Sequence, residues 1–332
     1  MRRAMVAALL ASAALVALDA GLPRLLNPYY LTIASRIGIA IIAAVSLQLV
    51  NGFTGQFSIG HAGFMAIGAY ASAALSVYAG APLIDALAQG LPAPLVRLVY
   101  FPLPLVFGGL VAALAGLVVS VPALRLRGDY LAIATLGAGE IIRIAILNID
   151  AVGGARGFSL ASPALPAVDL RYESLAGVYG TMLLVVAAIG RLVYAGGGLA
   201  FRAVREDETA AASLGIATTR VKVEAFLVAS FFAGVAGALF AHSEGYIHTK
   251  SFSFVRSFEI VAFVVLGGLG SLSGAILAAA TLTAVPEFLR GLGEWRMVLY
   301  SMLLIATMLL RPQGLLGQRE LWPIRLLEGR KP

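Results

Sequence analysis

The sequence is divided into a series of apolar runs, most of them about long enough for a helix to cross the hydrocarbon core of a bilayer. A helix needs about 20 predominantly apolar residues to cross that core. Runs of this kind lie at 4–20, 31–50, 57–80, 100–121, 130–147, 177–194, 225–242, 257–286 and 295–310. Only 12% of the 332 residues are charged, about half of the share typical of soluble domains. Because so few charges cannot supply a polar surface, the sequence excludes an ordinary cytosolic enzyme, a nucleic-acid-binding protein and a disordered chain.

The first run and the longest run decide how many segments cross the membrane. The run 4–20 follows Arg2 and Arg3, which fits both a retained span and a cleaved signal peptide. We expect a retained span, because Asp19-Ala20-Gly21 is a poor cleavage site. The run 257–286 is too long for one straight span and contains the Gly- and Ser-rich stretch 267–274. Counted as two segments broken at that stretch, it predicts an all-α polytopic membrane bundle of about ten transmembrane segments. A Pro-rich connection is expected at 81–97.

Basic residues predict which side of the membrane the ends face. Lys and Arg gather in the connection 196–224 and in the tail 311–332, and cytoplasmic segments of membrane proteins carry this excess. With Arg2 and Arg3 at the start, both termini and the connection 196–224 are expected in the cytoplasm. We expect one transmembrane domain, 1–332, with these two cytoplasmic segments.

Sequence motifs for catalysis are missing. The chain has no cysteine, and its three histidines lie far apart without metal-ligand spacing. Neither the GxxxxGK[ST] motif of ATP-binding loops nor the HExxH zinc motif occurs. We therefore expect a transport subunit that is not an enzyme, with no catalytic residue, no metal and no cofactor of its own. A glycine-rich bundle with broken helices is typical of transporters.

The connection 196–224 is the most charged stretch of the chain. Residues 199–214 predict one short amphipathic helix on the membrane face, and Gly215 predicts its left-handed end. The residues expected to couple this helix to a partner are Phe201, Arg202, Val204, Arg205, Glu206, Asp207, Glu208 and Gly215. Phe201, Val204 and Leu214 are expected as the apolar anchors, with Arg202, Arg205 and Asp207 orienting the helix at the rim. The alternative is a solvated connector whose charges only follow the topology.

The same connection resembles the coupling loop of ABC importer permeases. The core of that loop is Glu-Ala-Ala, three further residues and then Gly. Here Thr209-Ala210-Ala211 and Gly215 align with it, and Thr209 replaces the leading Glu.

Longer stretches resemble one group of these permeases, the M-type (LivM) family of branched-chain amino acid ABC importers. The matching stretches are 51–64, 126–143, 202–216 and 264–274, in the same order along the chain. The resemblance implies a bacterial inner-membrane permease that forms part of the path for branched-chain or related apolar amino acids. It also implies a homologous permease subunit, two cytoplasmic ATPase subunits that use ATP, and a periplasmic substrate-binding protein. Membrane lipid is the remaining partner, and no nucleic acid is expected.

Candidate residues of the translocation path are polar or small groups within or beside the apolar runs. They are Gln56, His61, Glu140, Arg143, Gly267, Gly270 and Ser271. His61 either contacts substrate or bonds a carbonyl freed by a broken helix. Glu140 and Arg143 share a helix face, and they form either part of the path or a structural ion pair. The glycines at 267–274 either pack helices together or form a hinge.

Other functions remain open from the residues alone. One alternative is an ABC importer of the same kind whose cargo is urea, short amides or other amino acids. A secondary transporter driven by an ion gradient would need a buried acidic coupling site, for which Glu140 is the candidate. A structural or receptor membrane protein would leave the connection 196–224 unexplained.

Overall fold

The computed structural model describes residues 27–90, 92–126, 128–160, 174–311, 313–317 and 319–321. The expected first span, 4–20, and the last part of the tail, 322–332, lie outside the described residues.

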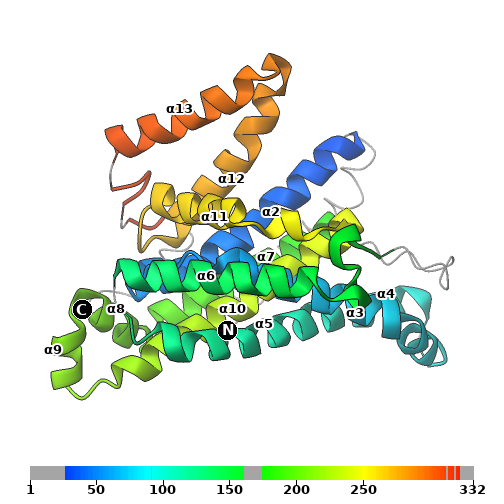
Figure 1. The fold of residues 1–332 in the computed structure, drawn as a ribbon, viewed down its shortest axis with the longest axis horizontal. Helices are drawn as coiled ribbons and strands as arrows, with labels where there is room; N and C mark the ends of the chain where they lie inside the picture. The colour runs from blue at the N-terminus through cyan, green and yellow to red at the C-terminus, as the bar shows by residue number, and fades with distance from the viewer. Residues whose placement is uncertain are drawn as a thin grey trace, which may run out of the picture.

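The described chain is a bundle of helices (Figure 1). The α-helices are α2 (Pro28–Gln48), α3 (His61–Ala88), α4 (Ala93–Tyr100), α5 (Pro102–Ala123), α6 (Asp129–Leu147), α7 (Leu175–Tyr194), α8 (Gly198–Glu206), α9 (Glu208–Ser213), α10 (Thr218–Glu244), α11 (Phe254–Gly267), α12 (Leu272–Phe288) and α13 (Trp295–Leu310). The π-helical turn η1 (Leu49–Phe53) extends α2, and 3-10 turns lie at η2 (Asp150–Val152), η3 (Gly154–Arg156), η4 (Thr249–Phe252) and η5 (Leu289–Leu292). The short strands β1 (Phe158–Ser159) and β2 (Tyr246–Ile247) pair antiparallel, with Phe158 opposite Ile247.

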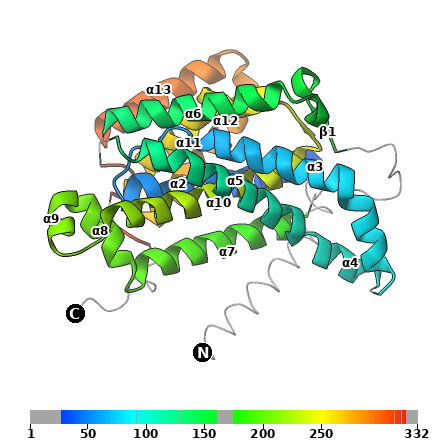
Figure 2. The ribbon, with the colours of Figure 1, turned by 60° about the horizontal axis from the view of Figure 1, so that its bottom comes forward.

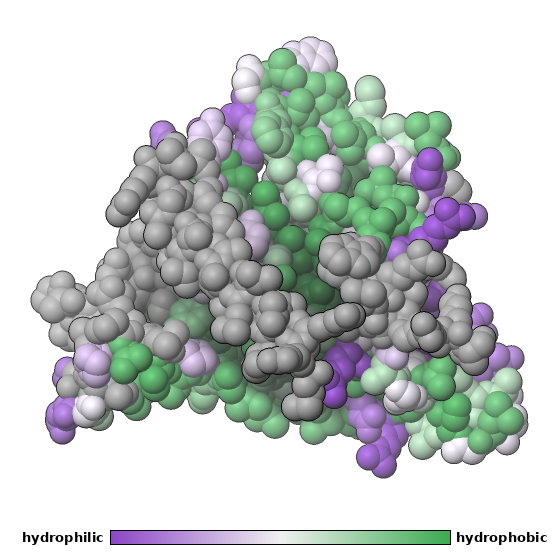
Figure 3. Space-filling view, turned by 180° about the vertical axis from the view of Figure 1, so that it is seen from behind, coloured by the Kyte–Doolittle hydropathy of each residue, from purple (hydrophilic) through white to green (hydrophobic). Residues whose placement is uncertain are grey.

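Among the described residues, 7 helices are long and apolar enough to cross a membrane. They are α2 with η1, α3, α5, α6, α7, α10 and α12 with η5. α13 is apolar but shorter, and α11 has 14 residues. Apolar side chains make up most of the coloured surface in Figure 3, and hydrophilic ones gather toward its margins. The expectation of an all-α polytopic membrane protein is confirmed, and the predicted break in 257–286 falls between α11 and α12.

The third span differs from the expected one. The run 57–80 was expected to end in a Pro-rich connection, but α3 begins at His61, passes through Pro82 and ends at Ala88. A further helix, α4, occupies part of the expected connection. The prediction of a connection at 81–97 is wrong because proline removes only one backbone donor while its φ suits a helix. Membrane helices tolerate such a proline where neighbours satisfy the freed carbonyl.

The centre of the bundle is formed by α2 and α10. In their most apolar stretches, 78% of the residues of α2 and 67% of those of α10 are buried, compared with 22% in α6. Glycines allow α3 and α10 to cross in direct backbone contact. A Cβ added to Gly68 would lie 2.1 Å from the carbonyl oxygen of Gly234, and one added to Gly237 would lie 1.9 Å from that of Met65. Small residues at helix crossings are the usual way to obtain such close packing in membranes.

The two ends of the bundle carry different structures. At one end, α8 and α9 lie together beyond α7 and α10 (Figure 2). α10 has 27 residues and therefore extends about 40 Å, reaching the opposite end, where β1 and β2 pair. Near that opposite end, Arg36 Nε lies 2.8 Å from Glu244 Oε1. We refer to the two as the α8–α9 end and the β1–β2 end.

Candidate functional site

Two breaks in membrane helices meet at the α8–α9 end. One consists of η1 and the loop 54–60, and the other is the turn 268–271 between α11 and α12. The side-chain amide of Gln48 joins them, because its Nε2 donates to the carbonyls of Gly268 at 2.8 Å and Ser271 at 3.1 Å. A Cβ added to Gly52 would lie 2.7 Å from the backbone nitrogen of Gly270. The breaks therefore pack directly on each other.

The turn 268–271 needs glycine for its backbone shape. Gly268 has φ 112° and Gly270 has φ 93°, and residues with a Cβ rarely adopt such values. The two helices also approach closely, because a Cβ on Gly267 would lie 2.5 Å from the carbonyl carbon of Gly274. Ser271 ends the turn as the N-cap of α12, its hydroxyl accepting from the Gly274 N–H at 3.0 Å. The candidate path residues Gly267, Gly270 and Ser271 thus shape this turn.

The loop 54–60 is tied to its neighbours through side chains. Asn51 and Ser58 exchange two hydrogen bonds, from Asn51 Nδ2 to the Ser58 carbonyl and from the Ser58 N–H to Asn51 Oδ1, both 3.1 Å. The Ile59 N–H donates to Thr135 Oγ1 on α6 at 3.1 Å. Non-helical backbone is tolerated within a membrane protein only where its polar groups are satisfied in this way.

His61 begins α3 directly after this loop and is buried. Its Nε2 lies 2.7 Å from Ser46 Oγ of α2. The partner is a side-chain hydroxyl, not the freed carbonyl that the sequence suggested. The contact joins the start of α3 to the central helix.

Gln56 is buried in the loop 54–60, with 5% of its surface exposed. Within the described part of the chain, neither atom of its side-chain amide has a hydrogen-bond partner, and the same holds for Gln48 Oε1. A buried amide without a partner is costly, so a water or a passing polar ligand would stabilise these groups.

Glu140 and Arg143 form an ion pair on α6, with Arg143 Nε 2.7 Å from Glu140 Oε2. Their side chains are 28% and 23% exposed. Each of the two charged side chains therefore has its partner on the same helix, as expected of a structural ion pair.

The connection expected at 196–224 ends before Thr218, where α10 begins, and it contains two helices where one was expected. α8 ends at Glu206, and Asp207 adopts an extended backbone and caps α9, accepting from the N–H groups of Thr209 at 2.7 Å and Ala210 at 3.0 Å. The prediction of one helix over 199–214 is wrong because Asp207 competes for these donors as an N-cap residue. Gly215 has φ 82°, as the predicted left-handed end requires.

The apolar face of α8 points into the protein. Phe201 is 4% exposed and Val204 is 5% exposed, and both pack in the main core. The expectation that these two present anchors to a partner is wrong, because they anchor α8 to its own bundle. The exposed apolar residues at this end are Leu199 at 69% and Leu214 at 81%. Arg202 and Glu206 of α8 are also exposed.

Other charged residues of α8 and α9 contact neighbouring parts of the same chain. Lys222 Nζ lies 2.5 Å from Glu208 Oε1, which joins α9 to α10. Arg205 lies beside both helix breaks, because a Cβ on Gly55 would lie 3.3 Å from its Cα, and one on Gly270 would lie 2.5 Å from its Nη1. α8 is therefore in direct contact with the loop 54–60 and the turn 268–271.

One residue of this site has no signal in the sequence. Glu320, in the tail, is 9% exposed and accepts hydrogen bonds from the first turn of α12 and from Tyr194. A single acidic residue after the last apolar run carries no periodicity or motif, so only the fold reveals it. Within the described ranges, no group of three His, Cys, Asp or Glu residues is placed to hold a metal ion.

Comparison with known proteins places the chain in a family. The family described as the branched-chain amino acid transport system permease component matches residues 29–310. The high-affinity branched-chain amino acid transport system permease protein LivM of Salmonella typhimurium is 41% identical over 235 residues, which cover 63% of this chain and 55% of that protein. The LivM protein of Escherichia coli is 40% identical over 235 residues with the same coverage.

A second type of relative is more distant. The corresponding permease protein LivH of Salmonella typhimurium is 32% identical over 172 residues, which cover 51% of this chain and 53% of that protein. The chain thus spans about half the length of the curated relatives it matches. No solved structure matches it. Because the family match extends over most of the chain, from residue 29 to residue 310, the chain belongs to the family of permease components of the branched-chain amino acid transport system.

Proposed function

We propose that this chain is a membrane-spanning permease subunit of an ABC importer for branched-chain or related apolar amino acids. The observation that carries the proposal is the helix pair α8–α9, which is fastened to the bundle by Phe201 and Val204 and presents Leu199 and Leu214 outward. A subunit without its own ATP-binding motif receives mechanical work through a contact surface. Family membership supports the cargo class.

The surface at the α8–α9 end fits the coupling role. Leu199 and Leu214 provide exposed apolar anchors, and Arg202 and Glu206 are exposed charged groups on the same helix as Leu199. Apolar anchors inside a charged rim are typical of specific docking surfaces. The occupant is one of two cytoplasmic ATPase subunits. A homologous permease subunit and a periplasmic substrate-binding protein complete the proposed machine.

The proposed path passes the two helix breaks. Gln48 and Gln56 have buried amide atoms without partners in the described chain, and His61 lies next to this loop. α8 contacts both breaks through Arg205. ATP binding and hydrolysis on the partner subunits would move α8 and α9, and the breaks would shift with them between outward and inward access.

The proposed topology has about ten spans in a bacterial inner membrane. Besides the 7 long apolar helices, α11 and α13 cross as shorter ones, and the run 4–20 supplies the remaining span. This arrangement places the α8–α9 end and both termini in the cytoplasm, as the basic residues predict.

Cysteine labelling tests this topology, because the natural chain has no cysteine. Gly196→Cys lies in an open position before α8, and Lys250→Cys lies exposed at the β1–β2 end. A membrane-impermeant maleimide should label Lys250→Cys in spheroplasts and reach Gly196→Cys only after lysis. Labelling of Gly196→Cys in intact spheroplasts would contradict the topology. Positions 162 and 330 extend the test to parts outside the described residues.

Uptake measurements test the cargo. In a strain without redundant importers, deleting this subunit should reduce uptake of radiolabelled leucine, isoleucine and valine to background. Uptake in the undeleted strain should continue when ionophores collapse the ion gradients, provided that ATP is maintained. Loss of urea or amide uptake in place of leucine uptake would favour the other cargo. Uptake that stops with the ion gradient would favour the secondary transporter.

A further inference from the structure

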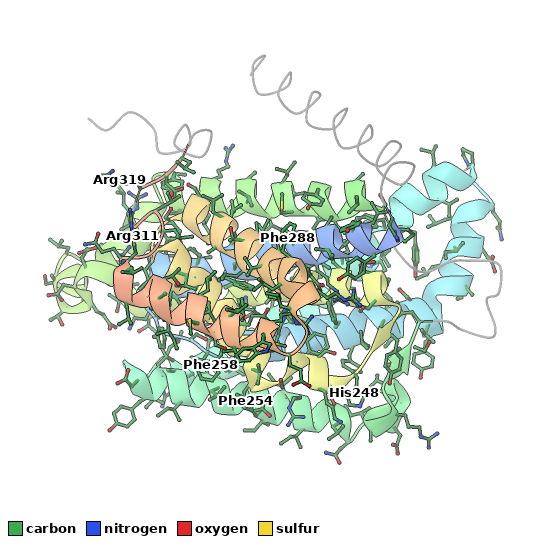
Figure 4. The ribbon with its side chains drawn as sticks, turned by 90° about the horizontal axis from the view of Figure 1, so that it is seen from above. His248, Phe254, Phe258, Phe288, Arg311 and Arg319 are labelled. Carbon is green, nitrogen blue, oxygen red and sulfur yellow. The ribbon has the colours of Figure 1, made fainter. Side chains whose placement is uncertain are left out.

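The C-terminal segment folds back over the turn between α11 and α12. The Leu315 N–H donates to the Leu266 carbonyl at 2.7 Å, and the Leu316 N–H donates to the Gly267 carbonyl at 3.3 Å. Ser271 Oγ donates to the carbonyl of Arg319 at 2.8 Å. Figure 4 shows Arg319 near Arg311, at the end of the bundle where α13 ends. Residues 313–317 and 319–321 therefore satisfy backbone groups that the helix break leaves free.

Glu320 is the residue of this segment that holds α12. Its Oε1 accepts from the Leu272 N–H at 2.6 Å, and its Oε2 accepts from the Ser273 N–H at 2.9 Å and from the Ser273 hydroxyl. The first N–H groups of a helix have no partner within it and carry partial positive charge, so a carboxylate is the favoured acceptor. Glu320 thus fixes the position of the α12 N-terminus.

The same carboxylate also holds Tyr194, whose hydroxyl donates to Glu320 Oε1 at 2.6 Å. Tyr194 is the last residue of α7, directly before the segment that leads into α8. Its ring packs edge-to-face on Phe53 of η1, with centroids 6.1 Å apart, and Arg202 Cζ of α8 lies 5.2 Å from the ring centroid. Tyr194 therefore contacts α8, the first helix break and Glu320 at once.

We propose that Glu320 is a positioning residue that transmits movement of α8, through Tyr194, to the N-terminus of α12. This inference rests on the proposed coupling function. The contacts form a continuous path from Arg202 on the outer surface of α8 to the turn 268–271. The tail beyond the last apolar run is then part of the coupling machinery. The alternative is that Glu320 only caps α12 and takes no part in coupling.

The hydroxyl of Tyr194 distinguishes the two, because Tyr194→Phe keeps the ring contacts and leaves the cap of α12 intact. The test uses the complete complex in proteoliposomes and measures ATP hydrolysed per radiolabelled leucine imported. We expect Tyr194→Phe and Glu320→Gln each to raise this ratio about fivefold, the lower range of energetic coupling between sites. The double variant should resemble either single variant, because both break the same path.

Controls separate coupling from stability. Tyr179→Phe removes a hydroxyl from the same helix, where it bonds the Ala34 carbonyl at 3.1 Å, and should leave the ratio unchanged. Tyr194→Phe loses one hydrogen bond to a carboxylate, so its melting temperature should fall, but by less than that of Glu320→Gln, which also weakens the cap of α12. An unchanged ratio in Tyr194→Phe, with only a lower melting temperature in Glu320→Gln, would show a cap alone and overturn the proposal. The comparison requires that the wild-type complex imports leucine with ATP. If it does, the unchanged ratio overturns only the path from α8 through Tyr194 and Glu320 to α12. If the wild-type complex does not import leucine with ATP, the proposed function is overturned as well.

Discussion

Gly237→Ala on α10 will strongly destabilise this bundle, although it adds only one methyl group. The added Cβ would lie 1.9 Å from the carbonyl oxygen of Met65 on α3, and no side-chain rotation relieves a clash between Cβ and backbone. The helices must separate at their closest crossing, which we expect to cost more than about 3 kcal/mol. Natural proteins are stable by only about 5–15 kcal/mol. The yield of monodisperse protein in detergent and its melting temperature measure the loss.

Gly137→Ala is the matched control. Gly137 lies within α6, and no atom lies within 4 Å of the position of its added Cβ. The same change should there leave the yield intact and stabilise the helix by roughly 0.5–1 kcal/mol. If Gly237→Ala gave wild-type yield and melting temperature, α3 and α10 would not cross in backbone contact.

The largest functional effect is expected from the exposed leucines of the α8–α9 end. Leu199→Glu together with Leu214→Glu should abolish leucine import while the permease still inserts and assembles. Both side chains are mostly exposed, so their loss does not open a cavity in the bundle. Removing an interface anchor costs about 2 kcal/mol or more, which corresponds to roughly thirtyfold weaker docking for each. Co-purification of ATPase subunits and leucine uptake measure the effect.

Two other variants in the same connection show whether the surface itself is responsible. Thr219→Glu adds a charge at an exposed position of α10 without removing an apolar anchor, and import should persist. Phe201→Ala removes a buried ring and should destabilise the permease by about 3–5 kcal/mol, visible as a lower melting temperature. Normal ATPase co-purification by the double glutamate variant would exclude this surface as the docking site.

The break in the run 257–286 and the left-handed end at Gly215 show what local sequence decides. A run too long for one span, interrupted by Gly and Ser, has few alternatives in a bilayer, because the membrane sets the length of a helix. Gly215 follows a short helix, and its φ of 82° suits glycine. The family resemblance carried by the stretches 51–64, 126–143, 202–216 and 264–274 agrees with the family match over residues 29–310.

The interior of the site depends on contacts between distant parts of the chain. Periodicity identified an apolar face on α8 but not what covers it, and the bundle itself covers Phe201 and Val204. The ion pair of Glu140 and Arg143, by contrast, can be predicted from their spacing, because both residues lie on one helix.

The membrane bundle, the positions of most spans and the break in one of them can be predicted from the sequence, because these properties follow from local apolarity and backbone freedom. The partners of polar groups that lie far apart in the sequence depend on the tertiary structure. Glu320 meets the N-terminus of α12 and Tyr194, residues far from it in sequence. Such a contact depends on how the helices pack, because a carboxylate binds whichever free donors the fold brings within reach.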